Sequence, residues 1–256
     1  MASISTEAVA ISEPILPTPT FQPSNPCTEP CRSIPTFQPS APCTEPCRSI
    51  PSFQLCSPLS LHPLAELSQV IGDPYDPPRP GREERHHGID FAYYHFGDRD
   101  SMQGEPIQAV LPGVVASALH DLYPYGNMVM VETTPDQLPP EVVIGLGFQP
   151  DESLYVLYAH MDIPPIVSLG EAVTACQPLG EVGMTGNTEL PHLHLETRLG
   201  PAASTFESMR YYDTRASLQE LAAYELWRTS GVYRHFDPMQ LLSFPLDPAL
   251  PLLANP

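Results

Sequence analysis

The middle of the chain consists of short apolar runs separated by glycine and proline, a pattern that predicts β-strands. The runs are residues 110–119, 127–134, 154–161, 171–182 and 192–199. Turn-forming glycines such as Gly113, Gly126 and Gly186 lie between or beside them. Closely spaced strands with turn signals favour antiparallel pairing. We therefore predict a mainly β fold with an antiparallel sheet core.

Helices are predicted only near the C-terminus. Ser217 and Glu220 have the spacing of a capping box, which predicts a helix over residues 217–229. Asp237 followed by Pro238 predicts the start of a short terminal helix, because aspartate caps helices well and proline is favoured at the first helical position.

The ends of the chain differ from the middle in composition. Proline accounts for 34 of 256 residues, and residues 19–50 hold two copies of a 16-residue Pro-rich repeat. Such a repeat has almost no side chains to pack, so it cannot bury a core. We expect residues 1–60 to be a disordered, low-complexity spacer, residues 61–244 the folded domain, and residues 245–256 a Pro-rich tail. Deletion of the spacer is expected to leave thermal stability nearly unchanged.

The cysteines follow the same division. Cys27, Cys31, Cys43, Cys47 and Cys56 lie in the N-terminal region, the first four of them in the repeats, and only Cys176 lies in the domain. The spacing of the cysteines in the repeats is not that of a structural zinc site. We therefore expect that these cysteines were copied with the repeat and have no role of their own, and local disulfides are the alternative. Cys176 has no cysteine or basic residue near it in sequence, and we interpret it as a buried, inert thiol.

Charge limits the possible partners. Acidic residues outnumber basic ones by 30 to 11, for a net charge of −19, and all the basic residues are arginine. Nucleic-acid binding depends on cationic contacts to phosphate, so it is not expected. No stretch has the ~18 consecutive apolar residues of a membrane span. The first residues have neither a basic segment nor a long apolar one and do not look like a signal peptide.

Chemistry is concentrated around the motif His192-x-His194-x-Glu196. In an extended strand these three side chains share one face. The motif alone fits a pair of exposed strand histidines as well as a metal site. A second segment carries His86 and Asp90, which fall on one face around Gly88. A catalytic zinc site needs three protein ligands and an open position, and His86, Asp90 and one histidine of the pair would supply them.

These segments resemble the lysostaphin-like (LytM-type) zinc endopeptidases of bacterial cell walls. The matching motifs begin with Arg85-His86-x-Gly88-Ile89-Asp90, followed by Tyr158-x-His160-Met161, and then by Gly183-x-Thr185-Gly186 with Pro191-His192-Leu193-His194-Leu195-Glu196. They occur in the family's order, and the resemblance covers roughly residues 72–198. It implies a fold of the duplicated hybrid motif type.

The resemblance also implies roles for single residues. His86, Asp90 and His194 would be zinc ligands, and His160 and His192 the catalytic histidines that do not bind metal. Its place on the strand makes Glu196 either an ordinary strand residue or one that holds a ligand histidine by a hydrogen bond. His87 is expected to face solvent. The long insertion 135–153 precedes the strand that delivers His160, so we expect it at the rim of the active groove.

The function implied is hydrolysis of peptide cross-links or stem peptides of peptidoglycan by a monomeric zinc endopeptidase in the cell envelope or outside the cell. Two alternatives remain. One is a non-catalytic module on the same fold that binds the cell wall or regulates amidases. The other is a general or self-processing peptidase, which gains weight from the missing export signal.

Overall fold

The computed structural model describes residues 53–244. The 16-residue repeats and the Pro-rich tail lie outside the described residues, so what the sequence predicts for them stays a prediction. Within residues 53–244, no helix is long and apolar enough to cross a membrane.

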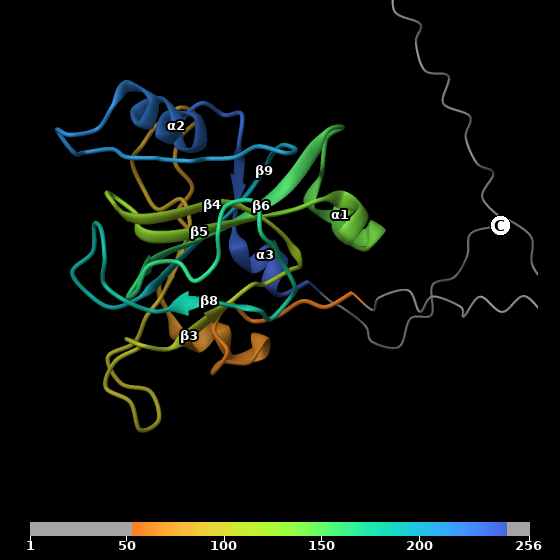
Figure 1. Cartoon of the computed structure of the whole chain (residues 1–256). Coiled ribbons are helices and arrows are strands. Elements are labelled where there is room, and N and C mark those ends of the chain that lie inside the picture. The colour runs from red at the N-terminus through yellow and green to blue at the C-terminus, as the bar shows by residue number, and fades with distance from the viewer. Residues whose placement is uncertain (1–52, 245–256) are drawn as a thin grey trace, which may run out of the picture. The chain divides into compact units, whose positions relative to one another are not determined.

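An antiparallel sheet forms the core of the domain, as the sequence predicted (Figure 1). Its strands run in the order β1-β2-β9-β6-β5-β4-β7, and β10 pairs with β9. The strands of this sheet are β1 (Ile71–Asp73), β2 (Ile89–Phe91), β4 (Gly113–Leu122), β5 (Gly126–Thr133), β6 (Glu152–Met161), β7 (Ala172–Val173), β9 (Leu193–Pro201) and β10 (Arg234–Phe236). A second, two-stranded sheet pairs β3 (Pro106–Gln108) with β8 (Pro178–Glu181).

The helices are short. They are the 3₁₀ helices η1 (Leu64–Val70) and η2 (Pro135–Gln137) and the α-helices α1 (Pro140–Leu146), α2 (Leu218–Arg228) and α3 (Pro238–Leu242). Both predicted C-terminal helices are present. Ser217 and Glu220 form the capping box of α2, and Asp237 caps α3.

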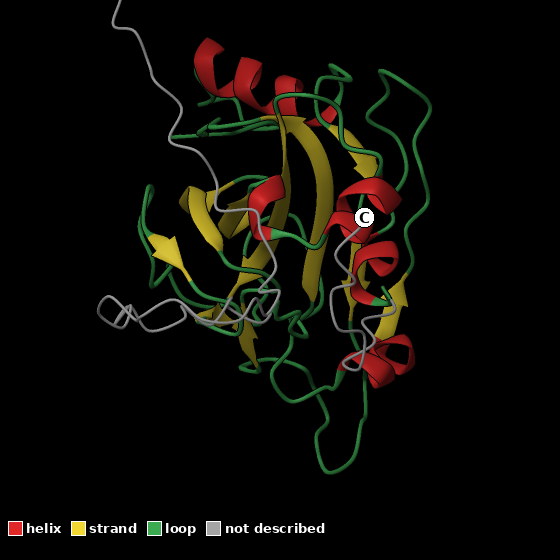
Figure 2. Ribbon diagram, turned by 90° about the vertical axis from the view of Figure 1, so that its right-hand side faces the viewer, coloured by secondary structure: helices red, strands yellow, loops and turns green. Residues whose placement is uncertain are grey.

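The two faces of the central sheet bury different clusters. On one face, Leu193 and Leu195 of β9 pack with side chains from β3 and β8. On the other face, Tyr224 and Trp227 of α2 pack on Leu157 and its neighbours. Figures 1 and 2 show α2 lying over that second face. Strand residues alternate between faces, so β9 sends its leucines to the first cluster and His194 and Glu196 to the side of α2.

One predicted strand is broken in two. The apolar run 171–182 forms β7 and β8, separated by a turn in which Cys176 has a φ of 63°. The sequence predicts a free, inert thiol at Cys176, and this prediction is wrong. Cys176 forms a disulfide with Cys56, with a Cα–Cα distance of 5.4 Å. The partner lies 120 residues earlier in the chain, so local sequence gave no signal for the pairing.

The disulfide ties an extended segment to the domain. Cys56 donates a backbone hydrogen bond to Val110, and the amide of Gln108 donates to Pro58, so residues 56–60 run along β3. Leu59 in this segment is fully buried. The deletion of residues 1–60 would therefore remove packed chain, and the expectation of unchanged stability holds only for a deletion that ends before residue 53.

The insertion 135–153 does not reach the site predicted for it. It holds η2 and α1 and joins β5 to β6 where Thr133 pairs with Leu154. His160 lies six residues further along β6, and a strand rises about 3.3 Å per residue, so the insertion is roughly 20 Å from His160. The expectation was wrong because β6 is long and starts at the far end of the sheet.

Candidate metal centre

Strand pairing brings two of the predicted ligands together. Asp90 of β2 lies opposite His194 of β9, and His86 enters from the turn that precedes β2. Gly88 lies between them at a point of close approach. A Cβ atom there would lie 2.3 Å from the carbonyl oxygen of Leu195, so only glycine lets this segment approach β9.

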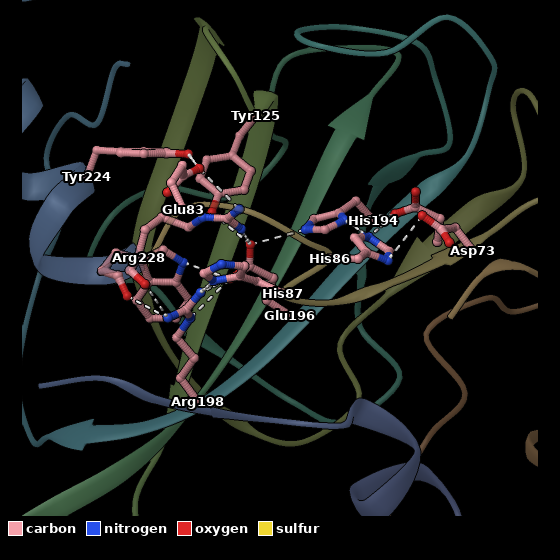
Figure 3. Close-up of polar contacts among 12 residues, drawn as sticks. Asp73, Glu83, His86, His87, Tyr125, His194, Glu196, Arg198, Tyr224 and Arg228 are labelled. Carbon is pink, nitrogen blue, oxygen red and sulfur yellow. Dashed lines mark hydrogen bonds and ion pairs between the residues drawn. The ribbon is translucent and has the colours of Figure 1, made fainter. Parts of the chain in front are cut away.

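Three donor atoms converge on one point. His86 Nε2 lies 3.0 Å from Asp90 Oδ1 and 3.1 Å from His194 Nδ1, and the last two atoms are 2.7 Å apart. Among the described residues, these three side chains form a group whose donor atoms all lie within 4.8 Å of one another. Figure 3 shows His86 and His194 side by side.

The outer nitrogens of both histidines are held by acceptors. His86 Nδ1 is 3.0 Å from the carbonyl oxygen of Pro74, and His194 Nε2 is 3.1 Å from Glu196 Oε1. A carbonyl or carboxylate oxygen only accepts, so each outer nitrogen carries a proton. The inner nitrogens are thereby left with lone pairs for a cation, which is the usual arrangement of metal-ligating histidines.

The charges at this point are strongly coupled. Burial alone would raise the pKa of Asp90, but hydrogen bonds from His194 and His86 hold this pKa well below its usual value. Burial lowers the pKa of His194, but hydrogen bonds to Asp90 and Glu196 outweigh it and raise the pKa to about 9. The carboxylate is therefore charged, and without metal a proton holds His194 to it. A cation must displace that proton, so we expect binding to weaken at low pH.

The donor set fits zinc. Two imidazoles and a carboxylate are a common catalytic zinc set, in which ligand atoms lie about 3.3 Å apart around a tetrahedral ion. The observed separations of 2.7–3.1 Å are a few tenths of an ångström shorter, a difference that small side-chain rotations can remove.

His160 reaches the same place through a β-bulge. The pairing of β5 with β6 shifts by one residue between the pairs Asn127–Met161 and Val129–Tyr158. His160 has a φ of 63°, which is rare for a residue with a side chain. Alternation would place it on the face of Tyr158, but the extra residue turns it toward the side of α2. This local strain is what aims the imidazole at the site.

His160 and His192 stand together beside the three donors. Their ring centroids are 4.7 Å apart, and the His160 ring is 5.8 Å from that of His194. The Nδ1 atom of each donates to a backbone carbonyl, of Thr185 at 2.7 Å and of Leu190 at 2.8 Å respectively. Burial, followed by the nearby positive charge of His194 and His192, lowers the pKa of His160 to about 3. His160 is therefore neutral at pH 7, with a bare Nε2.

Two adjoining cavities open onto the group. One, of about 210 Å³, is lined by Asp90, His160, His192 and His194 together with Tyr212 and Arg228. The other, of about 480 Å³, shares Asp90 and His192 and extends past Tyr94 and Leu190. Together they run past the donor atoms, as a groove for an extended substrate must. Tyr212 and Arg228, both from the segment 200–236, form part of the wall of the smaller cavity.

Sequence reasoning missed the buried polar residues behind the candidate metal centre and placed His87 wrongly. His87 is fully buried rather than facing solvent, and its Nδ1 accepts a hydrogen bond of 2.9 Å from Arg198. Glu83, Tyr125 and Arg228 also lie within the polar contacts shown in Figure 3. They come from separate parts of the chain, and no local motif links them.

A comparison with family models now adds to the geometry. Residues 141–205 match the model described as Peptidase family M23. The LytM-type resemblance is thereby confirmed. The M23 match includes β6 and β9, with His160, His192, His194 and Glu196, but it begins after His86 and Asp90, which lie outside it. The comparison with curated proteins gave no match.

Several solved peptidase structures are similar to part of the chain. The catalytic domain of the antimicrobial peptidase lysostaphin from Staphylococcus simulans is 25% identical, with 54% of this chain and 86% of that chain covered and a TM-score of 0.38. A mutant catalytic domain of the prophage-encoded M23 protein EnpA from Enterococcus faecalis is 24% identical, with 53% and 85% covered and a TM-score of 0.38. A zinc containing peptidase from Vibrio cholerae is 24% identical, with 50% and 33% covered and a TM-score of 0.34.

Proposed function

We propose that this protein is a zinc-dependent endopeptidase that hydrolyses peptide bonds in peptidoglycan. The observation that carries the proposal is the convergence of three metal-donor atoms beside two imidazoles that are each held through Nδ1 by a backbone carbonyl. In this assignment His86, Asp90 and His194 hold the ion. Zinc held there would polarise a scissile carbonyl and lower the pKa of water.

The protein's own groups would then handle protons. Both His160 and His192 donate through Nδ1 to a fixed carbonyl, so each ring is oriented and only Nε2 can accept a proton. One Nε2 takes the proton of the attacking water. The other, once protonated, donates to the developing oxyanion or to the leaving amine. The lowered pKa of His160 keeps this ring neutral before reaction, as an acceptor must be.

Peptidoglycan peptides are the proposed substrate class because of the LytM-type motifs and the M23 match. The groove formed by the two cavities is open at the surface and suits an extended peptide. A non-catalytic module would not need the three metal donors and the two catalytic histidines in one place. Their convergence therefore favours the enzyme.

The test separates ligand from catalyst within one tripeptide. His194→Ala should lose most of the bound zinc, because a three-ligand site cut to two binds far more weakly. His192→Ala should keep close to one zinc per chain and still lose about 10²–10⁴-fold in rate, the usual contribution of a general acid–base group. Zinc is measured by mass spectrometry and turnover on purified peptidoglycan, with folding matched by circular dichroism.

Two results would contradict the proposal. If the wild-type protein binds zinc but releases no new amino groups from peptidoglycan or from other peptides, the non-catalytic alternative is favoured. If His192→Ala loses the metal while His194→Ala keeps it, the two roles are reversed.

A further inference from the structure

The carboxylate of Glu196 is the centre of a buried polar cluster behind the candidate metal centre. The side chain is fully buried, yet it is charged, because nearby guanidinium groups outweigh the cost of burial and hold its pKa well below the usual value. Both oxygens are saturated. Oε1 accepts from Tyr125, His194 and Arg228, and Oε2 accepts from Arg198 and Trp227.

Arg228, the last residue of α2, links this cluster to a second carboxylate, that of Glu83. Its Nη1 donates to Glu196 Oε1 at 2.8 Å, while Nη2 lies 3.2 Å from Glu83 Oε1. The side chain of Arg228 is 11% exposed and that of Glu196 is fully buried, so their contact is shielded from water, whereas Glu83 is 27% exposed. Glu83 is held a second time by the hydroxyl of Tyr224, one turn earlier on α2, at 2.6 Å.

The two carboxylates belong to the two segments that carry the predicted ligands. Glu196 follows His194 by two residues on β9, and Glu83 precedes His86 by three residues in the turn before β2. The same oxygen of Glu196 accepts from His194 and from Arg228. Arg228 therefore joins the partner of one ligand to the segment of another. Figure 3 shows this chain of contacts running from Glu83 through Arg228 to Glu196 and His194.

We propose that Arg228 is a positioning residue for the metal centre, acting through Glu196 on His194 and through Glu83 on the segment of His86. The proposal rests on the proposed function of that centre. α2 would then be part of the metal-binding machinery, beyond its role in covering the sheet.

The geometry requires arginine at this position. A planar guanidinium presents several donors in fixed directions and can hold two carboxylates at once. A lysine ammonium in the same place could pair with one of them only loosely. Without Arg228, Oε1 of Glu196 loses a donor and Glu83 loses its link to β9, so the orientation of His194 and the position of His86 are both less restricted.

The experiment measures zinc affinity by competition with a chromophoric chelator. Loss of a residue that hydrogen-bonds a metal ligand typically costs 10–100-fold in metal affinity. Arg228 acts one contact further out, so we expect Arg228→Gln to lose about tenfold, the lower end of this range, with Arg228→Lys between it and the wild type. Glu83→Gln should weaken binding less, because Arg228 still contacts Glu196. The double variant should lose less affinity than the product of the two single losses, because either substitution alone already removes the contact between Glu83 and Arg228.

Two controls distinguish positioning from general stability. Arg215→Gln removes an arginine whose side chain is 78% exposed and pairs with Asp213 on the surface, and it should leave zinc affinity unchanged. Val142→Ala removes methyl groups from a fully buried residue of α1 in the distant insertion. It should destabilise the fold in urea without weakening zinc binding.

The outcomes separate this inference from the proposed function. Zinc affinity within twofold of wild type in Arg228→Gln and Arg228→Lys overturns the positioning role, while wild-type activity on peptidoglycan still supports the enzyme. The losses of zinc affinity in Arg228→Gln and Glu83→Gln could also combine fully in the double variant. That result would refute a shared role for the two residues. If Arg228→Gln does not fold, Arg228→Lys and Glu83→Gln carry the test, and unchanged affinity in both refutes it.

Discussion

Removal of the disulfide between Cys56 and Cys176 should destabilise the domain strongly. The bond joins residues 120 positions apart, so it closes a very long loop in the unfolded chain. The chain-entropy relation gives about 5 kcal/mol at 25 °C for a loop of this length, and native disulfides typically contribute about 2–4 kcal/mol. A domain of this size shifts in Tm by about 2–4 °C per kcal/mol, so the loss should be roughly 4–16 °C.

The assay is thermal unfolding followed by circular dichroism, with a chelator present to remove any contribution of metal. The variant is the double substitution Cys56→Ser and Cys176→Ser, which leaves no unpaired thiol in the domain. A reductant should lower the Tm of the wild type to that of the variant and leave the variant unchanged. Serine at Cys27, Cys31, Cys43 and Cys47 is the matched control and should not change Tm.

The packing around Cys56 adds a second contribution. Leu59 is fully buried, and residues 56–60 make backbone hydrogen bonds with β3. A reduced chain can keep these contacts, so reduction should cost less than deletion through residue 60. Equal Tm values for the oxidised wild type and the double variant would refute the reasoning, as would a peptide map in which Cys56 and Cys176 are not linked.

The remaining predictions concern the site, the insertion and pH. Gly88→Ala should lower both Tm and zinc content, because the new methyl group would lie 2.3 Å from the carbonyl oxygen of Leu195 and push β2 away from β9; normal zinc content would contradict this. Replacing residues 135–151 with a short turn should leave kcat/KM on peptidoglycan within about twofold, since the insertion is roughly 20 Å from His160, while Tm falls as buried Val142 is lost. Saturation with zinc at about 100 times its Kd should stabilise the wild type by about 2.7 kcal/mol, and His194→Ala should show no such gain. Burial, followed by the charge of Arg198, lowers the pKa of His235 in the folded protein. His235 in the unfolded chain therefore binds a proton more readily, and the free energy of unfolding falls as the pH drops below about 6.5, the pKa of histidine in the unfolded chain. The stability difference between wild type and His235→Gln in urea should therefore shrink between pH 7.5 and pH 5.5, and a difference that grows would contradict the sign.

The sequence predicted those parts of the molecule that have a local period or motif. Strand alternation in His192-x-His194-x-Glu196 was enough to place histidines and glutamate on one face and leucines on the other. The capping box of α2 marked the start of that helix correctly. Both features depend on residues only two or three positions apart.

The parts that sequence reasoning missed depend on contacts between distant segments. His160 faces the site only because a β-bulge reverses the alternation of β6. Cys176 finds its partner 120 residues away, and Arg228 meets Glu83 across 145 residues. The insertion was misplaced because its position depends on strand length rather than on order in the chain.

The pairing of β2 with β9 has a consequence for the order of folding. His86 and His194 are 108 residues apart, and the chain between them forms β3 to β8. Closing so long a loop is slow and is repaid only when the intervening strands have already paired. We therefore expect the candidate metal centre to form at a late step, so that zinc, if bound as proposed, would not nucleate the fold as it does in small zinc-binding domains. During refolding, a zinc-sensitive dye should release its metal to the protein only after the β-sheet signal in circular dichroism has developed.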